Sequence, residues 1–366
     1  MSEISKKKVA LFLPSLRGGG AERVMLNLAK GLAEENLDVD LILAQAEGEY
    51  INQVPENVRI IDLKSSRILK SLPKLIHYLK KENPESILSA LTHANIVLIL
   101  AKLFSKGTTR IVVSEHSNLT HGIKHSKSIK EKIFPLFMNL TYKYADEIVA
   151  VSNGVAEDLK KNIKSLHKDV KVIYNPILEE RIFTQAKAPL NNPVPIHRPY
   201  LLSVGRLTEA KDYATLISAF SLIAQQYDGD LLILGEGEEK KRLEALAIEL
   251  GVSNRVLFLG FTDNPYKYMR NCDLFVLSSK WEGLPTVLVE ALAVGSKVVS
   301  TRCPSGPEEI LKNGEIGILT PVGDEIKMAE NLLLGLRYKQ NINPEIDLKE
   351  YYSSYVVNSY KKIMIK

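Results

Sequence analysis

Residues 278–293 read SSKWEGLPTVLVEALA and stand between two apolar runs, 272–277 and 298–300. Short apolar runs bounded by turn residues are typical of buried parallel strands. We expect a helix to begin between them, and Pro285 suits its first position, where no amide donor is needed. The stretch therefore predicts a strand–helix–strand unit of an α/β fold.

The start of that helix is a predicted anion site. Its first amide groups lack partners within the helix and lie at the positive end of the helix dipole. Glu282 is in the preceding loop, and Glu290 lies inside the helix. Two acids beside such a site suit a ligand whose hydroxyl groups flank a phosphate. The alternative is an ordinary helix with solvated acids.

A second strand-to-helix junction lies upstream, where the apolar run 200–204 predicts a strand. Arg206 and Lys211 follow it and fall near the carboxyl end of that strand. Arg206 can form two parallel hydrogen bonds to an anion, while Lys211 acts as a point charge. The pair could neutralise a diphosphate, and an exposed salt-bridge pair is the alternative. Further strands are predicted at 230–234 and 255–259.

The first half of the chain opens with a strand at 9–14, a glycine-rich turn and a helix at 24–33. Gly18 and Gly20 begin a G-x-G-x-x-G pattern, but Arg23 replaces its third glycine. With an acid near position 40, this pattern also fits a Rossmann dehydrogenase. The longer turn at Pro14 argues against that alternative.

Asp38-Val39-Asp40 spells D-x-D, a pair of carboxylates that binds metal ions in some enzymes. It enters a predicted strand at 39–43, so we expect a solvated strand edge and no metal. Cys272 and Cys303 have no metal-ligand spacing and form no disulfide framework.

Polar residues follow two further predicted strands, 86–91 and 110–114. His93 and Asn95 follow the first, and His116 follows the second. Since ligands of open α/β sheets bind at the carboxyl ends of strands, His116 is the stronger candidate for a ligand contact. A hydrogen-bonded loop histidine is the alternative. Strands at 147–151 and 170–176 complete this half, and the segment 184–199 has the composition of a linker.

The charge of the 366-residue chain is uneven. Its net charge is +5, with +8 in residues 1–200 and −3 in the rest. The range 59–143 carries 15 Lys and Arg against 5 Asp and Glu. Lysines and an aromatic residue in one basic segment could dock on an anionic membrane, although solvated helix faces are the alternative. These residues are Lys124, Lys127, Lys130, Lys132 and Phe134.

Composition favours a two-domain soluble protein. No apolar run reaches the roughly 20 residues needed to span a bilayer. The N-terminal residues lead directly into a strand, so we expect no signal peptide and a cytoplasmic location. No nucleic-acid-binding module is present in the sequence.

Several of these features resemble one family. Glu282 and Glu290, with Gly-Leu-Pro after the first, resemble the two-glutamate motif of retaining glycosyltransferases of family 4, which have the GT-B architecture. Val204-Gly205-Arg206-Leu207 followed by Lys211 is similar to the family's diphosphate-binding pair. Residues 303–324 resemble members that extend lipid-linked or surface glycans with N-acetylhexosamine-type sugars.

The resemblance implies two Rossmann-like domains that face each other across a cleft. Residues 1–183 would form the acceptor domain, 184–199 the linker and 200–350 the donor domain. The C-terminal helix 351–366 would pack back on the first domain, with Tyr355, Val356, Tyr360 and Ile363 spaced for one face.

The resemblance also implies roles for single residues. Glu282 would hold the hydroxyls of the donor sugar, Glu290 the ribose, and His116 the sugar or acceptor. Together with Arg206 and Lys211, Glu282 and His116 form the predicted catalytic set. The predicted donor-binding residues are Gly19, Gly20, Arg206, Lys211, Gly260, Phe261, Glu282, Gly283, Leu284, Pro285, Thr286 and Glu290.

The function that this implies is transfer of a hexose or N-acetylhexosamine from a nucleotide-diphosphate donor, with UDP favoured, to a glycan or polyprenyl-diphosphate-linked acceptor. We expect retention of configuration, no metal or other cofactor, and peripheral association with the inner face of the plasma membrane. The alternatives are a GDP-sugar mannosyltransferase of the same fold, a non-catalytic sugar-nucleotide-binding protein and the dehydrogenase.

Overall fold

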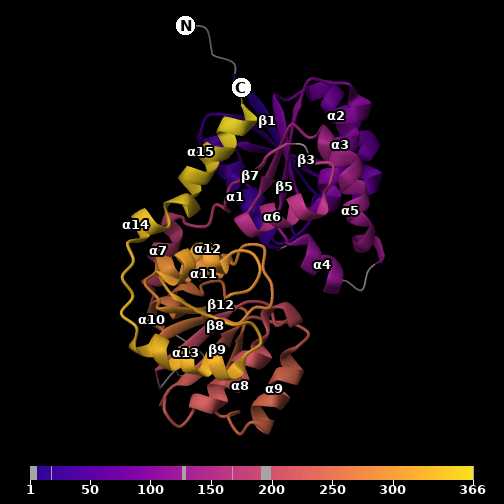
Figure 1. Cartoon of the computed structure of the whole chain (residues 1–366). Helices are drawn as coiled ribbons and strands as arrows, with labels where there is room; N and C mark the ends of the chain where they lie inside the picture. The colour runs from indigo at the N-terminus through magenta and orange to yellow at the C-terminus, as the bar shows by residue number, and fades with distance from the viewer. Residues whose placement is uncertain (1–5, 18, 126–128, 167, 191–198, 366) are drawn as a thin grey trace. The chain divides into compact units, whose positions relative to one another are not determined.

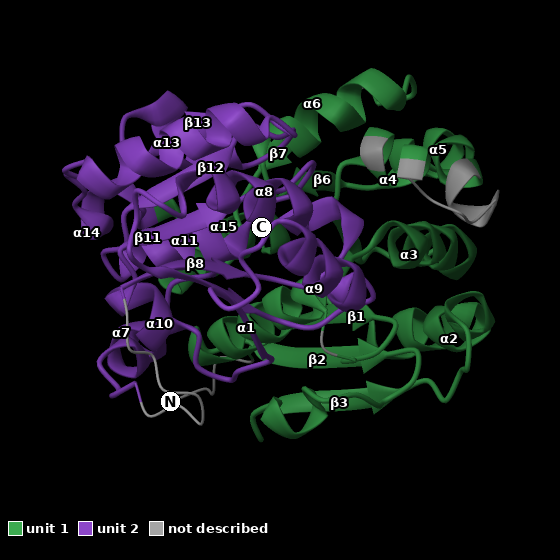
Figure 2. Ribbon diagram, turned by 90° about the horizontal axis from the view of Figure 1, so that it is seen from below, with its two compact units in different colours: residues 1–176, 350–366 green, residues 177–349 purple. Residues whose placement is uncertain are grey.

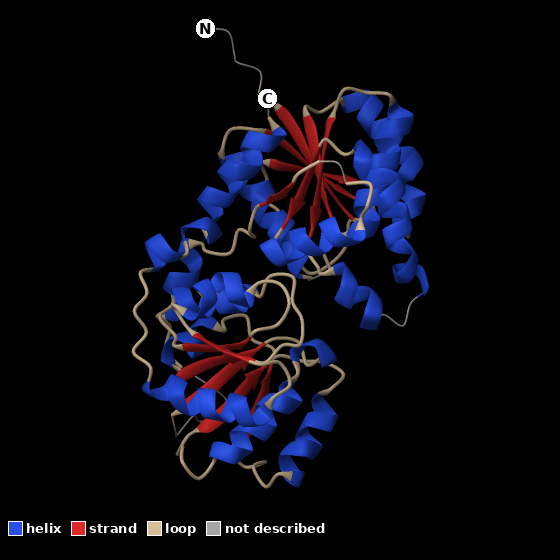
Figure 3. Ribbon diagram, in the orientation of Figure 1, coloured by secondary structure: helices blue, strands red, loops and turns tan. Residues whose placement is uncertain are grey.

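The computed structural model describes residues 6–17, 19–125, 129–166, 168–190 and 199–365 (Figure 1). The chain forms two compact units, which Figure 2 colours separately. Unit 1 comprises residues 1–176 and 350–366, and unit 2 comprises residues 177–349. Each unit is a parallel sheet covered by helices on both faces (Figure 3), which confirms the predicted fold class.

Unit 1 contains a seven-stranded sheet in the order β3-β2-β1-β4-β5-β6-β7, with every pair parallel. Its inner strands are almost wholly buried, because helices cover both faces and their sequences are largely apolar, whereas the edge strands β3 and β7 are partly exposed. The strands are β1 (Lys8–Leu13), β2 (Asp38–Leu43), β3 (Val58–Asp62), β4 (Ser86–Ala90), β5 (Arg110–Glu115), β6 (Glu147–Ala150) and β7 (Val170–Val172).

Helices connect these strands in the usual doubly wound manner. They are α1 (Gly20–Glu34), α2 (Leu72–Glu82), α3 (Thr92–Ser105), α4 (Leu119–His125), α5 (Ile129–Thr141), α6 (Asn153–Asn162) and α15 (Ser353–Met364), with 3-10 turns η1 (Ile51–Gln53), η2 (Ile68–Ser71) and η3 (Tyr142–Tyr144).

Unit 2 contains a six-stranded parallel sheet in the order β10-β9-β8-β11-β12-β13. Its strands are β8 (Tyr200–Val204), β9 (Asp230–Leu234), β10 (Val256–Gly260), β11 (Leu274–Leu277), β12 (Val298–Thr301) and β13 (Ile318–Thr320). Its helices are α7 (Glu180–Ala186), α8 (Tyr213–Ile223), α9 (Lys240–Glu249), α10 (Tyr266–Asn271), α11 (Thr286–Ala293), α12 (Pro307–Ile310), α13 (Glu325–Arg337) and α14 (Pro344–Asp347), with η4 (Glu209–Lys211), η5 (Lys312–Gly314) and η6 (Lys349–Tyr351).

Each sheet has one point where the strand order reverses. In unit 1 it lies between β1 and β4, and in unit 2 between β8 and β11. The connections on the two sides of such a point leave the sheet in opposite directions and open a crevice at the carboxyl ends of the strands. The fold therefore marks one candidate ligand site in each unit.

The C-terminal helix α15 belongs to unit 1 and packs on α1. Val357 is buried against Gly31, where an added methyl group would come within 2.4 Å of the valine side chain. The buried face of α15 is Val356, Val357, Tyr360 and Met364. The predicted face was partly wrong, because Tyr355 is 46% exposed.

Most strands lie within two residues of their predicted bounds, but β3 and β13 were not predicted. Both are edge strands without a long apolar run, since Ile60 of β3 is exposed and β13 has only three residues. The division between the units falls after Pro176, before the predicted linker. Helix α7 lies with unit 2, where Asn264 Nδ2 donates to the Gln185 carbonyl at 2.9 Å.

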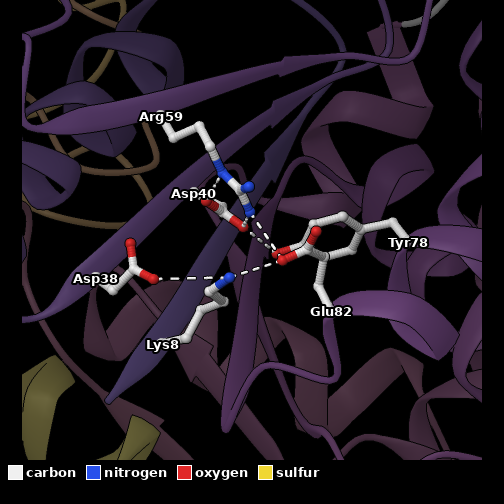
Figure 4. Close-up of polar contacts among 6 residues, drawn as sticks. All are labelled: Lys8, Asp38, Asp40, Arg59, Tyr78 and Glu82. Carbon is white, nitrogen blue, oxygen red and sulfur yellow. Dashed lines mark hydrogen bonds and ion pairs between the residues drawn. The ribbon is translucent and has the colours of Figure 1, made fainter. Parts of the chain in front are cut away.

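The expectation of a solvated edge at Asp40 was wrong. Its side chain is fully buried and accepts hydrogen bonds from Arg59 Nε at 2.7 Å and Tyr78 Oη at 2.6 Å. Figure 4 shows these three residues with Lys8 and Glu82 at the amino ends of the strands. Buried charges persist only when paired and hydrogen-bonded, so this cluster fixes β2 and β3 against α2.

Glu82, the last residue of α2, accepts from Lys8 Nζ at 2.6 Å and Arg59 Nη2 at 3.0 Å. Hydrogen bonds from Lys8 and Arg59 lower the pKa of Glu82 from 4.5 to about 2. A depressed carboxyl pKa stabilises the fold above the unfolded value, and this contribution is lost as the pH falls from 4.5 towards 2. The cluster therefore stays intact across the neutral range.

Replacing the cationic partner of the buried acid should destabilise unit 1. We expect Arg59→Met to lower the free energy of unfolding by about 3 kcal/mol, because Asp40 keeps its charge in a buried site without its ion-pair partner. Hydrogen exchange during urea titration measures this, since it reports β1–β3 separately from unit 2.

The matched control is Arg17→Met, which removes an exposed ion pair with Glu47 in the same unit and should cost less than about 1 kcal/mol. The double variant Arg59→Met/Asp40→Asn should recover part of the loss. If the two single variants lowered the free energy of unfolding equally, the buried pair would contribute no more stability than the exposed pair.

Candidate active site

The loops that leave β8 and β11 meet at the reversal point of unit 2. Lys211 Nζ lies 2.6 Å from Glu282 Oε1, and their side chains are only 20% and 12% exposed. The structure therefore brings together two of the predicted catalytic residues, which are separated by 71 positions in the chain. A half-buried pair is screened less by solvent than a surface pair.

Further hydrogen bonds join the same two loops. Ser278 Oγ donates to the Lys211 carbonyl at 2.7 Å, and Lys280 N donates to the Ala210 carbonyl at 2.8 Å. Ser279 Oγ donates to Glu282 Oε1 at 2.6 Å. Glu282 thus receives two donors, so its carboxylate has a fixed position.

Helix α11 begins at Thr286, directly after this loop, and Pro285 is its N-cap residue, one position earlier than predicted. Gly306 lies against Pro285 and has a φ of +103°, and a methyl group there would come within 2.3 Å of the proline ring. Only glycine allows this approach. The backbone of residues 283–286 is therefore held beside the Lys211–Glu282 pair.

Arg206 also follows β8, but its side chain is exposed. In the part of unit 2 that the structure describes, its guanidinium forms no hydrogen bond or ion pair. Glu290 lies half-buried on α11. The site thus contains one paired cation, one unpaired cation and a helix N-terminus, which together suit a polyanionic ligand.

Gly260 ends β10 and lies beside Gly235, which directly follows β9, since Gly235 N donates to the Gly260 carbonyl at 2.8 Å. Gly235 has a φ of +137°, and a methyl group there would overlap the Gly205 carbonyl oxygen. Phe261 follows with 73% of its surface exposed. The predicted donor-binding residues Gly260 and Phe261 therefore place an exposed aromatic ring at the carboxyl edge of the sheet.

In unit 1, His116 follows β5 and is half-buried. Its Nε2 lies 3.1 Å from Ser114 Oγ. Burial lowers the pKa of His116 to about 4, so the imidazole is neutral at neutral pH. A neutral ring can donate one hydrogen bond and accept one.

The neighbouring residue Glu115 was not singled out by the sequence. Its carboxylate is fully buried and accepts hydrogen bonds from Thr92 Oγ1 at 2.8 Å, Asn95 Nδ2 at 2.8 Å and Tyr142 Oη. Burial raises the pKa of Glu115, while these donors oppose that shift. The signal that could have identified Glu115 is an acidic residue at the end of an otherwise apolar strand.

The glycine turn was predicted to approach the donor. Gly18 lies outside the described residues, Gly19 is the N-cap of α1, and Gly20 is its first residue. A methyl group at Gly20 would meet nothing within 4 Å. The fold of unit 1 therefore does not itself require glycine at this position.

The predicted membrane segment is described in part. Lys124 is exposed, Lys127 lies outside the described residues, and the side chains of Lys130 and Lys132 are also outside them. Phe134 is half-buried and stacks on His93, with ring centroids 6.5 Å apart. Phe134 is therefore less available to a partner than predicted, because α3 covers part of its ring.

No group of three or more His, Cys, Asp and Glu in the described ranges is placed to hold a metal ion. None of the described helices is both long enough and apolar enough to cross a bilayer.

Comparison with known proteins connects this geometry to one family. Residues 186–342 match the family described as "Glycosyl transferases group 1", and residues 18–181 match "Glycosyltransferase Family 4". Together the two matches cover most of both units.

Two curated relatives are from Campylobacter jejuni. N-acetylgalactosamine-N,N'-diacetylbacillosaminyl-diphospho-undecaprenol 4-alpha-N-acetylgalactosaminyltransferase is 35% identical over 338 residues, covering 89% of each chain. GalNAc-alpha-(1->4)-GalNAc-alpha-(1->3)-diNAcBac-PP-undecaprenol alpha-1,4-N-acetyl-D-galactosaminyltransferase is 27% identical, covering 93% of this chain and 91% of its own.

Among solved structures, Anabaena HepE in complex with UDP matches with a TM-score of 0.72 and 20% identity over 98% of this chain and 96% of its own. At this identity the likeness concerns the fold. The two parallel sheets, the matched families and the 35% identical relative agree. The chain therefore belongs to the family 4 glycosyltransferases with the GT-B fold.

Proposed function

We propose that this protein transfers an N-acetylhexosamine or hexose from a UDP-sugar to a hydroxyl group of a polyprenyl-diphosphate-linked glycan, with retention of configuration. The observation that carries the proposal is the Lys211–Glu282 pair beside the start of α11. It joins a cation for a diphosphate to an acceptor for sugar hydroxyls in one site.

The leaving diphosphate gains negative charge as the bond to the sugar breaks. Arg206, Lys211 and the amides at the start of α11 stabilise that charge without needing to reorganise. Glu282 holds Lys211 in place before the donor binds, at 2.6 Å. Because protein cations neutralise the diphosphate, the reaction needs no metal ion.

The acids and the aromatic ring bind the other parts of the donor. Glu282 accepts from the sugar hydroxyls and Glu290 from the ribose hydroxyls. The exposed Phe261 ring and the Gly260 backbone contact the base. In unit 1, an added methyl group at Gly20 would meet no described atom within 4 Å, so a ligand could approach the backbone there.

The names of the two Campylobacter relatives support the acceptor and the stereochemistry. Both describe acceptors on diphospho-undecaprenol and products with an α linkage. An α product from an α-linked UDP-sugar is retention. No described side chain is placed as a covalent nucleophile, so we propose front-face attack in which the leaving phosphate takes the proton of the acceptor hydroxyl.

The outer face of unit 1 supports contact with a membrane that carries such an acceptor. Helices α3 and α5 pack together and expose apolar side chains: Leu103, Phe104, Ile133, Leu136, Phe137 and Leu140. Exposed lysines accompany them at Lys106, Lys124 and Lys143. Apolar insertion combined with basic residues favours an anionic bilayer surface.

Removing either cation should weaken UDP binding. We expect Arg206→Ala and Lys211→Ala each to raise the Kd for UDP about tenfold or more, because each loses a hydrogen bond to a charged group. Isothermal titration calorimetry in EDTA measures this and also tests the metal-free site. Lys327→Ala, which removes a 51% exposed lysine of α13, is the matched control and should bind UDP normally.

Replacing Glu282 should separate binding from turnover. Glu282→Gln keeps the side-chain shape but loses the charged acceptor, so we expect kcat to fall up to about a hundredfold while UDP binds at least as tightly. The assay follows sugar transfer from UDP-N-acetylhexosamines to a polyprenyl-diphosphate-linked glycan. Glu308→Gln removes a half-exposed acid of the same unit and should be silent. Unchanged kcat in Glu282→Gln would remove this residue from the site.

The apolar surface of α3 and α5 should be required for membrane binding. We expect Phe104→Ser/Phe137→Ser/Leu140→Ser to lose flotation with vesicles of phosphatidylglycerol and phosphatidylcholine. Neutralising the four lysines of 124–132 should weaken it further, by about 1 kcal/mol per lysine near the surface. Ile326→Ser/Leu334→Ser on α13 is the control. Undiminished flotation of the triple variant would place the contact elsewhere.

A further inference from the structure

The C-terminal helix α15 contributes one hydroxyl group to the end of β5. Tyr360 is 1% exposed, and its Oη lies 3.2 Å from Ser114 Oγ. Ser114 Oγ in turn lies 3.1 Å from His116 Nε2. Three polar groups therefore form a chain from the last helix to the histidine that the sequence predicts as a contact of the sugar or acceptor.

The direction of the protons follows from burial. Burial raises the pKa of Tyr360 to about 12, so its hydroxyl keeps its proton. Over the residues that the structure describes, Ser114 Oγ is the only acceptor within hydrogen-bonding distance of this hydroxyl. A buried donor without an acceptor is costly. Tyr360 therefore donates to Ser114.

Ser114 has a single proton of its own. Among the described residues, its oxygen has only Tyr360 Oη and His116 Nε2 within hydrogen-bonding distance. Since this oxygen accepts from Tyr360, the Ser114 proton has His116 Nε2 as its one acceptor, and that nitrogen accepts with its lone pair. Burial also lowers the pKa of His116 to about 4, so the neutral ring carries its one proton on Nδ1. The reverse direction would leave the buried Tyr360 proton without an acceptor.

We infer that Tyr360 is a positioning residue for His116: through Ser114 it places the imidazole proton on Nδ1 and makes His116 a hydrogen-bond donor to the bound sugar or acceptor. This inference rests on the proposed function. It also restricts that function, because a ring that presents Nδ1–H cannot accept the proton of the acceptor hydroxyl. The leaving phosphate therefore remains the group that takes this proton.

Both ends of the chain of hydroxyls are held firmly. Ser114 lies in the middle of the sheet, and its carbonyl accepts from Asn95 Nδ2 at 2.9 Å. On the other side, Arg110 Nε donates to the Ile363 carbonyl of α15 at 2.8 Å. The spacing between Tyr360 and His116 is therefore set by packing and not by a flexible loop.

Nitrogen-15 spectra of the histidine rings test the tautomer directly. In protein labelled with [15N]histidine, we expect the His116 ring to carry its proton on Nδ1 throughout the neutral pH range. The His116→Asn variant identifies which signals belong to this ring. A wild-type ring with its proton on Nε2 overturns the inference.

The variant Tyr360→Phe removes the hydroxyl and keeps the ring that packs on α1. We expect the His116 tautomers to mix and kcat to fall about fivefold, as for loss of one hydrogen bond, while UDP binding is unchanged. Tyr355→Phe removes a hydroxyl from the exposed face of the same helix and is the control. A Tyr360→Phe protein with unchanged tautomer and turnover overturns the inference.

Substitution of His116 itself separates positioning from folding. Asn carries an amide nitrogen close to the position of Nδ1, whereas Gln carries one close to Nε2. We therefore expect His116→Asn to retain more turnover than His116→Gln, and the opposite order contradicts the inference. The spectra do not depend on turnover. If the wild-type protein shows the predicted tautomer but has no transferase activity, this result overturns the proposed function and not the tautomer.

Discussion

The contact between Lys211 Nζ and Glu282 Oε1 is the interaction on which the candidate site of unit 2 depends. Both residues come from loops at the carboxyl ends of adjacent strands, so the parallel sheet brings them together although they are far apart in sequence. A lone buried cation would be unfavourable. The glutamate therefore allows a positive charge to stand in a half-buried site before any anion arrives, while Arg206 remains in solvent.

In unit 1, neutral hydrogen-bond donors stabilise a buried charged group. At the carboxyl end of β5, the buried Glu115 carboxylate has hydroxyl and amide donors in place of a cation. These donors include Thr92, the first residue of α3, so the positive end of the helix dipole also stabilises the acid. The adjacent His116 is neutral. This edge of unit 1 is thus suited to hydrogen bonding with hydroxyl groups.

The sequence predicted the fold class and most strands because parallel strands depend on local patterns. Apolar runs marked the strands, and ligand residues of an open sheet lie where those runs end. It missed β3 and β13, which are edge strands without a full apolar run. It also misassigned Asp40, whose partner Arg59 lies on β3. It also could not show that Tyr360 reaches Ser114, since that contact joins positions 246 apart.

The amino and carboxyl ends of the unit 1 strands differ in how their polar side chains are paired. Lys8, Asp40 and Arg59 lie near the amino ends of β1, β2 and β3, where their charges are satisfied by one another and by Glu82. Such a network contributes stability but leaves no charge for a ligand. At the carboxyl edge, an added methyl group at Gly20 would meet no described atom within 4 Å, and Nδ1 of His116 has no hydrogen-bond partner among the described residues. Because every strand is parallel, strong internal pairing can be confined to one edge while the other is kept for binding. The contact of α15 is consistent with this division, since Tyr360 donates to Ser114, whose hydroxyl satisfies Nε2 of His116 and leaves Nδ1 for a substrate.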